Sequence, residues 1–339
     1  MAISRVVVLG LESSLASFIS GPLDVFAMVG VLWNRIHGEE AAPRFQVEVV
    51  SQDGRPISCA NGTALVPHGS LDRVRQADLV IVSSAGLDVD GVLSTHRRAI
   101  RWLARLHEKG ATLASVCTGA FLLAETGLLD GRTATTHWGF ADEFRRRYPR
   151  VRLMPERTIT DEGDLLCAGG ADSGLWLCLY LIERELGHEV AAQTAKAFLL
   201  DLRPPPQQSF TDFRGRRGHG DAQVALVQDR LELLFAQALT LEGLAAEAGM
   251  SPRNLHRRFK AVTGDAPRAY LQRVRIEAAK RLLERTRNGV EQIGYEVGYS
   301  DSRFFRRLFR EQVGTGPASY RKRFRQLRWG TERPSRQEA

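Results

Sequence analysis

The stretch from Leu255 to Tyr270 recurs fifty residues later, from Phe305 to Tyr320. Each copy has two apolar residues spaced four apart, basic residues beside them, and then Gly, Pro and Tyr in that order. The aligned positions are Leu255, Arg257, Phe259, Lys260, Gly264, Pro267 and Tyr270 with Phe305, Arg307, Phe309, Arg310, Gly314, Pro317 and Tyr320. This spacing predicts a short helix with one apolar and one cationic face, which Gly ends before Pro begins another helix. We interpret the repeat as two copies of one DNA-reading helix.

A short amphipathic helix is predicted just before the first copy. Residues 241–249 end in Gly, and Ser251 with Pro252 then provides an N-cap and a first helical residue. Helix, tight turn and second helix is the order of a helix-turn-helix. Apolar residues at helical spacing over 267–285 predict a long helix that joins this unit to the next one.

The second unit repeats the same plan. Residues 290–297 form the predicted short helix, Gly298 turns the chain, and Ser300 or Asp301 caps a helix over 302–312. The chain is therefore expected to hold two helix-turn-helix units.

Both units resemble the DNA-binding domain of AraC/XylS transcription regulators. The resemblance covers residues 223–325 and is carried by Ser251–Gly264, by Gly298–Phe309 and by Gly316–Arg321. One departure is Gly294, where the family more often has Ala. We expect it to loosen the second short helix slightly.

Helical periodicity divides the side chains of the two reading helices. Leu255 with Phe259, and Phe305 with Phe309, are expected to be buried, and the polar residues to stay exposed. Arginine can bind guanine O6 and N7 with two hydrogen bonds, and the family resemblance implies base contacts at Arg253, His256, Arg257, Ser302, Arg303 and Arg307. Phosphate contacts, which position a protein without reading sequence, are predicted for Lys260, Arg306 and Arg310. The alternative for any one of them is a solvated surface cation.

Positive charge is confined to one third of the chain. Residues 223–339 carry 23 Lys and Arg against 13 Asp and Glu, a net charge of +10, whereas residues 1–222 carry 24 against 26. This distribution is expected if only the C-terminal third meets phosphate.

The N-terminal part has a different pattern, in which short apolar runs alternate with helical segments. The predicted strands are 5–9, 45–50, 78–83 and 111–116, and the predicted helices include 22–35 and 97–109. Near-continuous apolar strands are typical of a parallel sheet covered on both faces, so residues 1–200 are predicted to form a doubly wound, flavodoxin-like α/β domain. Residues 201–222, which include three consecutive prolines, are expected to bury little and to link it to an all-α DNA-binding domain at residues 223–329.

Cys117 stands at a sharp turn in that first domain. The strand ending at Val116 runs directly into Cys117 and Thr118, and a helix follows over 121–126. A nucleophile in this position lies at the positive end of a helix, where its thiolate is favoured. His137 is a candidate to approach the Cys in space.

With Gly21–Val25 and Cys167–Gly170, these segments resemble the PfpI-type, class I glutamine-amidotransferase-like fold, in the subgroup that precedes AraC-type DNA-binding domains. The resemblance spans residues 4–200. Peptidase and deglycase members also use a Glu at the position of Phe18, and Phe provides no acid or base. Trp176, where many regulator relatives have Asp, prevents transfer of a ligand identity. We therefore predict a ligand site with no catalytic residue; retained chemistry and plain core packing of Cys117 are the alternatives.

Ligands in an open α/β sheet bind beyond the carboxyl ends of the strands. By that rule the predicted pocket is lined by Asp24, Gly86, Cys117, Thr118, His137 and Trp138. An aromatic face attracts a cation, and amides at a helix start bind an anion. Such a set suits a small zwitterion, and regulators of this architecture typically sense amino acids or quaternary amines. Each residue has a structural alternative, and Asp24 in particular is equally a capping residue.

The four cysteines, at 59, 117, 167 and 178, have neither zinc-ligand nor paired spacing, so no metal site, disulfide framework or cofactor is expected. The chain shows no signal peptide and no apolar stretch near twenty residues, which predicts a soluble cytoplasmic protein.

We therefore expect a transcription regulator that responds to a small metabolite. Its N-terminal domain would bind an amino-acid-like or amine-like effector and form a homodimer, and its C-terminal domain would read double-stranded operator DNA in two adjacent major grooves. RNA polymerase is a further candidate partner. One competing class is a cysteine hydrolase or amidotransferase-like enzyme tethered to DNA. Another is a constitutive architectural DNA binder with an inert N-terminal domain.

Overall fold

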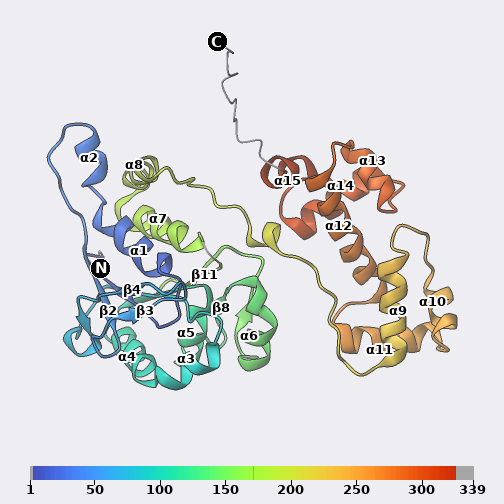
Figure 1. The fold of residues 1–339 in the computed structure, drawn as a ribbon, viewed down its shortest axis with the longest axis horizontal. Coiled ribbons are helices and arrows are strands. Elements are labelled where there is room, and N and C mark those ends of the chain that lie inside the picture. Colours follow the sequence, from blue (N-terminus) through green and yellow to red (C-terminus); the bar gives the residue numbers. More distant parts are fainter. Residues whose placement is uncertain (1–2, 171, 326–339) are drawn as a thin grey trace, which may run out of the picture. The chain divides into compact units, whose positions relative to one another are not determined.

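The computed structural model describes residues 3–170 and 172–325, and the chain divides into two compact units, Met1–Gln208 and Ser209–Ala339 (Figure 1). The first unit is α/β and the second is built from helices, as the sequence predicts. Residues 326–329 of the expected DNA-binding domain lie outside the described residues.

A seven-stranded sheet forms the centre of the first unit. Its order is β10-β11-β7-β6-β1-β2-β5, and all neighbours are parallel except β10 and β11, which are antiparallel. The strands are β1 (Arg5–Leu9), β2 (Gln46–Ser51), β5 (Gly69–Ser70), β6 (Leu79–Val82), β7 (Thr112–Val116), β10 (Ile159–Asp161) and β11 (Leu165–Ala168). Two small sheets accompany it, formed by β3 (Ile57–Ser58) with β4 (Ala64–Leu65) and by β8 (Thr133–Ala134) with β9 (Arg152–Leu153).

Helices cover both faces of this sheet, which explains why its central strands are apolar on both sides. All four residues of β6 are fully buried. In Figure 1, α1, α7 and α8 lie on one side of the sheet, and α3, α4, α5 and α6 lie on the other. The helices are α1 (Ser17–Ala27), α2 (Leu32–Ile36), α3 (Val89–Thr95), α4 (Arg97–Glu108), α5 (Ala120–Glu125), α6 (Ala141–Arg147), α7 (Ser173–Leu186) and α8 (His188–Phe198). The 3-10 turns are η1 (Leu71–Arg73), η2 (Cys117–Gly119), η3 (Trp138–Phe140) and η4 (Gln207–Phe210).

The predicted helix over 22–35 is wrong in its limits. Helix α1 begins five residues earlier, with Pro22 inside it, and a break separates it from α2. Gly30 lies in that break with φ +72°, and a Cβ there would come within 2.1 Å of the Ala42 carbonyl oxygen. The left-handed turn therefore ends the helical run.

The second unit has two apolar cores joined by one long helix. The first core includes Leu255, Phe259 and Tyr270, and the second includes Phe305, Phe309 and Tyr320. Helix α12 contributes to both, as predicted for residues 267–285. The helices are α9 (Ala222–Leu233), α10 (Leu241–Glu247), α11 (Pro252–Thr263), α12 (Pro267–Arg285), α13 (Val290–Glu296), α14 (Ser302–Val313) and α15 (Pro317–Phe324).

The expectation that residues 201–222 bury little is wrong. Gln207 is 5% exposed and Ser209 is 1% exposed. Phe213 packs edge-on against Tyr270, with ring centroids 5.1 Å apart, and Arg217 forms ion pairs with Asp229 and Glu232. We call residues 204–219 the strap. Its side chains make specific contacts, which its Pro- and Gly-rich composition did not predict.

No helix within 3–170 and 172–325 is long and apolar enough to cross a membrane. The four cysteines are buried and free.

Candidate nucleic-acid interface and ligand site

The first reading helix, α11, is built by local signals. Ser251 accepts a hydrogen bond from the Asn254 amide at 3.3 Å, Pro252 is the first helical residue, and Gly264 ends the helix with φ +86°. Leu255 and Phe259 are fully buried. The residues predicted to contact DNA are all exposed, namely Arg253, His256, Arg257 and Lys260.

The second reading helix, α14, has the same design. Asp301, one of the two predicted caps, accepts from the amides of Arg303 and Phe304 at 2.7 and 3.1 Å. Phe305 and Phe309 are fully buried, and the exposed predicted residues are Arg303, Arg306, Arg307 and Arg310. Ser302, the first helical residue, is half-buried, contrary to expectation.

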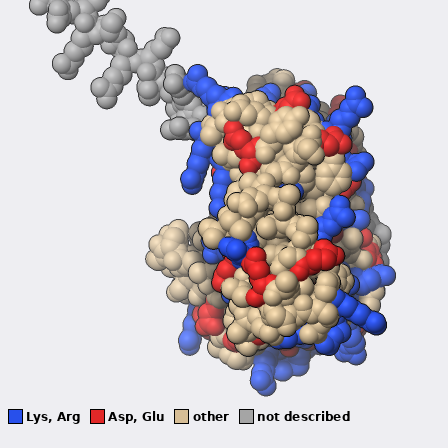
Figure 2. Space-filling model, turned by 90° about the vertical axis from the view of Figure 1, so that its right-hand side faces the viewer, with Lys and Arg blue, Asp and Glu red and all other residues tan. Residues whose placement is uncertain are grey.

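Most of these cations have no hydrogen-bond or ion-pair partner within residues 3–170 and 172–325. Arg257 donates one exposed hydrogen bond, at 3.0 Å, to the Asn254 side chain. Arg307 lies 3.9 Å from Glu311 and 5.3 Å above the Phe304 ring. Figure 2 shows many Lys and Arg side chains projecting from the face that it draws. Exposed pairs of this kind contribute little stability, so the guanidinium groups remain available to a ligand.

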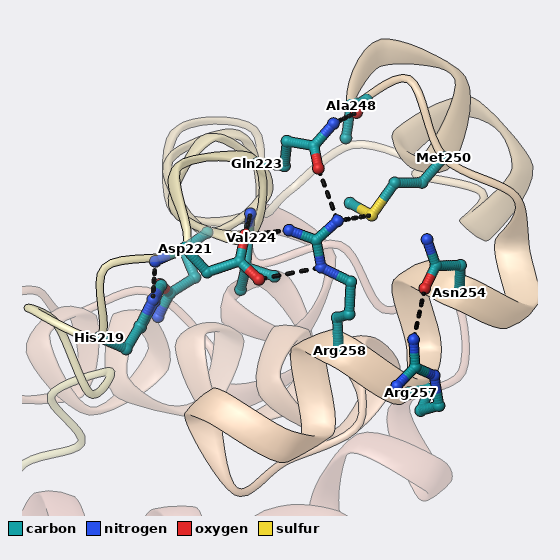
Figure 3. A network of polar contacts seen from close by, with 10 residues as sticks. His219, Asp221, Gln223, Val224, Ala248, Met250, Asn254, Arg257 and Arg258 are labelled. Atoms are coloured by element: carbon teal, nitrogen blue, oxygen red, sulfur yellow. Dashed lines mark hydrogen bonds and ion pairs between the residues drawn. The ribbon is translucent and has the colours of Figure 1, made fainter.

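Arg258, beside Arg257, has an entirely different environment. Its guanidinium donates two hydrogen bonds to Asp221, at 2.7 and 3.0 Å, and one to the Gln223 side chain at 2.6 Å. Figure 3 shows Arg258 pointing toward these residues and Met250, whereas Arg257 points to Asn254. Asp221 is also the N-cap of α9. Arg258 therefore fixes α11 to α9 and to the turn before α11.

An equivalent clamp holds the second turn. Arg275 of α12 donates to the carbonyl oxygens of Phe235, Gly298 and Gln237 at 2.7, 2.9 and 2.9 Å. Gly298 has φ +92°, and a Cβ there would come within 2.7 Å of a backbone oxygen. Sequence reasoning missed both clamps because their acceptors lie far away along the chain.

The short helix of the second unit contains Gly294. A Cβ at this position would lie 3.1 Å from the Phe305 ring. Because Gly294 faces that ring, Gly rather than Ala at this position leaves space for the buried Phe305 side chain.

In the first unit, Cys117 occupies the predicted turn between β7 and α5. Its φ is +59°, a strained value for a residue with a Cβ, and it is 7% exposed. Burial raises the pKa of the Cys117 thiol and outweighs hydrogen bonds from the Thr118 amide and the Ser84 hydroxyl, which lower it. The thiol is therefore neutral at neutral pH, and the prediction of a favoured thiolate is wrong.

Phe18 explains part of this environment. It is 7% exposed and belongs to the same apolar cluster as Cys117 and Val116. An apolar ring thus packs in the cluster that holds the thiol, which disfavours charge there.

His137 lies close to the turn but makes no hydrogen bond to Cys117 among the described residues. Its Nδ1 accepts from the Gly139 amide at 3.1 Å, and its ring stacks on Trp138 with centroids 5.4 Å apart. Burial lowers the pKa of His137, so the ring is neutral at pH 7. The neighbouring Thr136 hydroxyl instead donates to the Cys117 carbonyl oxygen at 2.9 Å.

Thr118 and Gly86 are tied to each other. The fully buried Thr118 hydroxyl donates to the Gly86 carbonyl oxygen at 3.1 Å, accepts from the Ala85 amide at 3.0 Å and contacts the Ser84 hydroxyl at 2.8 Å. Its hydrogen-bonding capacity is filled. These residues hold the loop after β6 against the Cys117 turn.

Asp24 is not brought into this group. It lies inside α1, so it is not a capping residue of that helix, and it is exposed. Its side chain makes no hydrogen bond or ion pair with any residue that the structure describes.

Two surface hollows of about 490 Å³ lie elsewhere in the first unit. One is lined by charged side chains from α3, α4 and α6, including Arg97, Arg101 and Arg147. The other lies beside the strap, lined by Tyr180, Pro204 and Pro206 among others.

Comparisons with known proteins agree with both halves of this description. A helix-turn-helix domain family matches residues 244–323, and the DJ-1/PfpI family matches residues 23–184. The HTH-type transcriptional regulator CdhR of Pseudomonas aeruginosa is 30% identical over 289 residues, which cover 85% of this chain and 84% of CdhR.

Two further similarities are to an enzyme and to a solved structure. The isonitrile hydratase of Pseudomonas putida is 27% identical over 240 residues, covering 70% of this chain and 92% of that enzyme. The crystal structure of a THiJ/PfpI family protein from Pseudomonas syringae matches with a TM-score of 0.50 at 16% identity, covering 80% of this chain and 91% of that one. This last match shows the fold alone.

Fold and reading helices define a DNA-binding transcription regulator. The chain belongs to the family of HTH-type transcriptional regulators that join a DJ-1/PfpI domain to an AraC-type helix-turn-helix domain.

Proposed function

We propose that the two reading helices enter adjacent major grooves and that the first unit controls this binding in response to an amino-acid-like or amine-like metabolite. The observation that carries the first part is the shared design of α11 and α14, each with a buried apolar pair and an exposed cationic face. Base contacts are assigned to Arg253, His256, Arg257, Ser302, Arg303 and Arg307. Phosphate contacts are assigned to Lys260, Arg306 and Arg310.

The proposed metabolite site lies at the Cys117 turn. Trp138, half-buried and stacked on a neutral His137, offers an aromatic face to a cationic group. Gly86, Cys117 and Thr118 are assigned to the same site; the buried Thr118 hydroxyl, whose hydrogen bonds are filled, would hold the loop that carries Gly86 rather than contact the ligand. Asp24 is assigned to a ligand that extends to the exposed face of α1, because its side chain makes no hydrogen bond or ion pair with the described residues.

A binding role for this turn is favoured over catalysis. Three observations support it: the thiol is neutral, Phe18 stands in the place of an acid, and His137 is engaged with the Gly139 amide. The similarity to isonitrile hydratase makes isonitrile hydration the reaction to assay. We expect no turnover; turnover that disappears in Cys117→Ser would reverse this assignment.

The ligand proposal is tested by thermal denaturation of the full chain with a panel of amino acids and quaternary amines. A ligand at a hundred times its Kd stabilises a protein by about 2.7 kcal/mol, which is a measurable rise in Tm. Trp138→Ala should abolish that rise. Trp33→Ala is a matched control, because Trp33 also packs against a histidine, His37, with ring centroids 4.1 Å apart. Loss of the response in the control, or its persistence in Trp138→Ala, would remove Trp138 from the site.

We further propose that the regulator acts as a homodimer that addresses paired half-sites, and that RNA polymerase is a partner at the promoter. Sedimentation of the full chain at micromolar concentration tests the first of these: a dimer is expected, and a monomer in the presence of DNA would contradict it.

A further inference from the structure

Residues 209–219 of the strap belong to the second unit, and we call them the brace. One end of the brace contacts the first apolar core of that unit. The Phe213 ring packs edge-on against Tyr270, with centroids 5.1 Å apart, and the Gln228 side chain donates to the Arg216 carbonyl oxygen at 3.0 Å. This end of the brace is therefore held by α9 and by the start of α12.

The other end of the brace contacts the second core. The buried Ser209 hydroxyl donates to the carbonyl oxygen of Val313, the last residue of α14, at 2.8 Å. Carbonyl groups at the end of a helix lack helical partners, so Ser209 caps the second reading helix. The Phe210 ring packs edge-on against Phe324 of α15, with centroids 5.2 Å apart. The brace thus contacts both helix-turn-helix units.

A buried lysine holds the middle of the brace. Lys280 of α12 is 3% exposed, and its Nζ donates to the Thr211 carbonyl oxygen and to Glu277 Oε1, the latter at 2.8 Å. Asp212 Oδ1 lies 3.8 Å from the same ammonium group. Apolar side chains can often replace a buried ion pair without loss of stability. Stability alone therefore gives no reason for a lysine here, whereas a fixed position of the brace on α12 does.

The distance between the two reading helices depends on the shape of α12, which carries part of both cores (Figure 1). A helix of 19 residues is about 28 Å long. A bend of about 7° displaces one end of such a helix by about 3.4 Å, which is the rise of one base pair. Contacts that reach from one core to the other oppose this bend, because bending must stretch or break one of them.

We propose that the brace fixes the spacing between α11 and α14 and so selects the distance between the two base-contact regions of the operator. Lys280 is the positioning residue at the centre of α12, and Phe213 and Ser209 hold the two ends. This inference rests on the proposed function, in which the two reading helices enter adjacent major grooves. It concerns contacts within the second unit and needs no metabolite.

Binding of the full chain to a series of duplexes tests the brace. The duplexes carry the two contact regions of the parent's own motif, moved apart or together by zero, one or two base pairs. One base pair changes the separation by about 3.4 Å and the relative direction by about 35°. The parent should therefore lose about tenfold in affinity or more at a shift of one base pair.

Two kinds of variant release the brace in different ways. Glu277→Leu/Lys280→Met removes both buried charges and keeps the volume filled, and Phe213→Ala detaches the end at the first core. In each variant the loss at a shift of one base pair should fall to about threefold or less. Thermal denaturation confirms that each variant is folded.

Arg217→Ala and Arg230→Ala form a matched pair. Both side chains are 42% exposed and both form an ion pair at 2.7 Å, Arg217 with Asp229 and Arg230 with Glu247. Only Arg217 belongs to the brace, so only its removal should relax the spacing preference. Arg230→Ala should keep the profile of the parent.

A sharp profile in the parent that all folded variants share would overturn the brace alone. Equal relaxation in Arg217→Ala and Arg230→Ala would also overturn it, because the effect would then follow any loss of an ion pair at α9. A parent that binds every spacing equally would overturn the brace together with the assignment of α11 and α14 to adjacent grooves.

Discussion

Arg257 and Arg258 are adjacent in sequence, and the structure predicts opposite consequences for their removal. Arg258→Ala removes two hydrogen bonds to Asp221 and one to Gln223, so it should destabilise the second unit. Arg257→Ala removes one exposed bond to Asn254, so it should leave stability nearly unchanged and weaken DNA binding.

The size of the first effect follows from the burial of the pair. Hydrogen bonds to charged groups contribute about 1.5–3 kcal/mol when one partner is removed. The Arg258 side chain is 32% exposed and that of Asp221 is 14% exposed, so solvent screens part of the interaction. Asp221 also keeps its bond to the Val224 amide. We therefore expect a loss of about 2 kcal/mol, which lowers Tm by about 6–10 °C in a unit of this size.

Urea denaturation and thermal denaturation of the two variants provide the assay. Arg257→Ala should stay within about 0.5 kcal/mol of the parent. Equal destabilisation by both substitutions, or none by Arg258→Ala, would refute the assignment of Arg258 as the clamp of the first turn.

Three further predictions concern acid, the thiol and the strap. Burial raises the pKa of Asp221, but hydrogen bonds from the Val224 amide and Arg258 outweigh it and hold the pKa below its ordinary value. The stability that this lowered pKa provides is present above about pH 4 and is lost as pH falls through the lowered pKa. The difference in stability between the parent and Arg258→Ala should therefore shrink in denaturation curves below about pH 4. Cys117→Ser should preserve folding and DNA binding and alter only the metabolite response; loss of DNA binding in a folded variant would contradict this. A fragment of residues 209–339 should fold with a higher Tm than one of residues 221–339, which lacks Phe213 and Arg217, and should bind DNA more weakly than the full chain because it loses the avidity of a dimer. Equal Tm values would show that residues 209–220 contribute nothing to the stability of the second unit.

The parts of the fold that the sequence predicted are those with local causes. Continuous apolar runs predicted strands such as β1 and β7, because a strand that is covered on both faces buries the side chains of both faces. The caps at Ser251 and Asp301 and the terminal glycines predicted α11 and α14, because capping is satisfied within one turn of chain. The four-residue spacing of the apolar side chains on those helices then predicted which cations are exposed.

The parts that were missed depend on groups that are distant in sequence. Pro22 suggested a helix start, yet α1 accommodates it inside. The Gln207 side chain forms hydrogen bonds with the backbone of Thr136, Pro155 and Gly170. These residues are distant in sequence, so the Pro-rich segment around Gln207 did not predict the contacts. The helix start at Cys117 suggested a thiolate, but burial dominates the pKa of the thiol, and burial depends on the whole packed domain.

DNA selection from a random duplex library tests the central claim most directly. The full chain, Arg257→Ala and Arg307→Ala would each be used to select binding sites at one salt concentration. The account predicts a parent motif with two contact regions about one helical turn apart, and each variant should lose about 1–3 kcal/mol of discrimination at a different region. Uniform weakening across all sequences in both variants, with the base preferences retained, would contradict the assignment of α11 and α14 as the helices that read DNA.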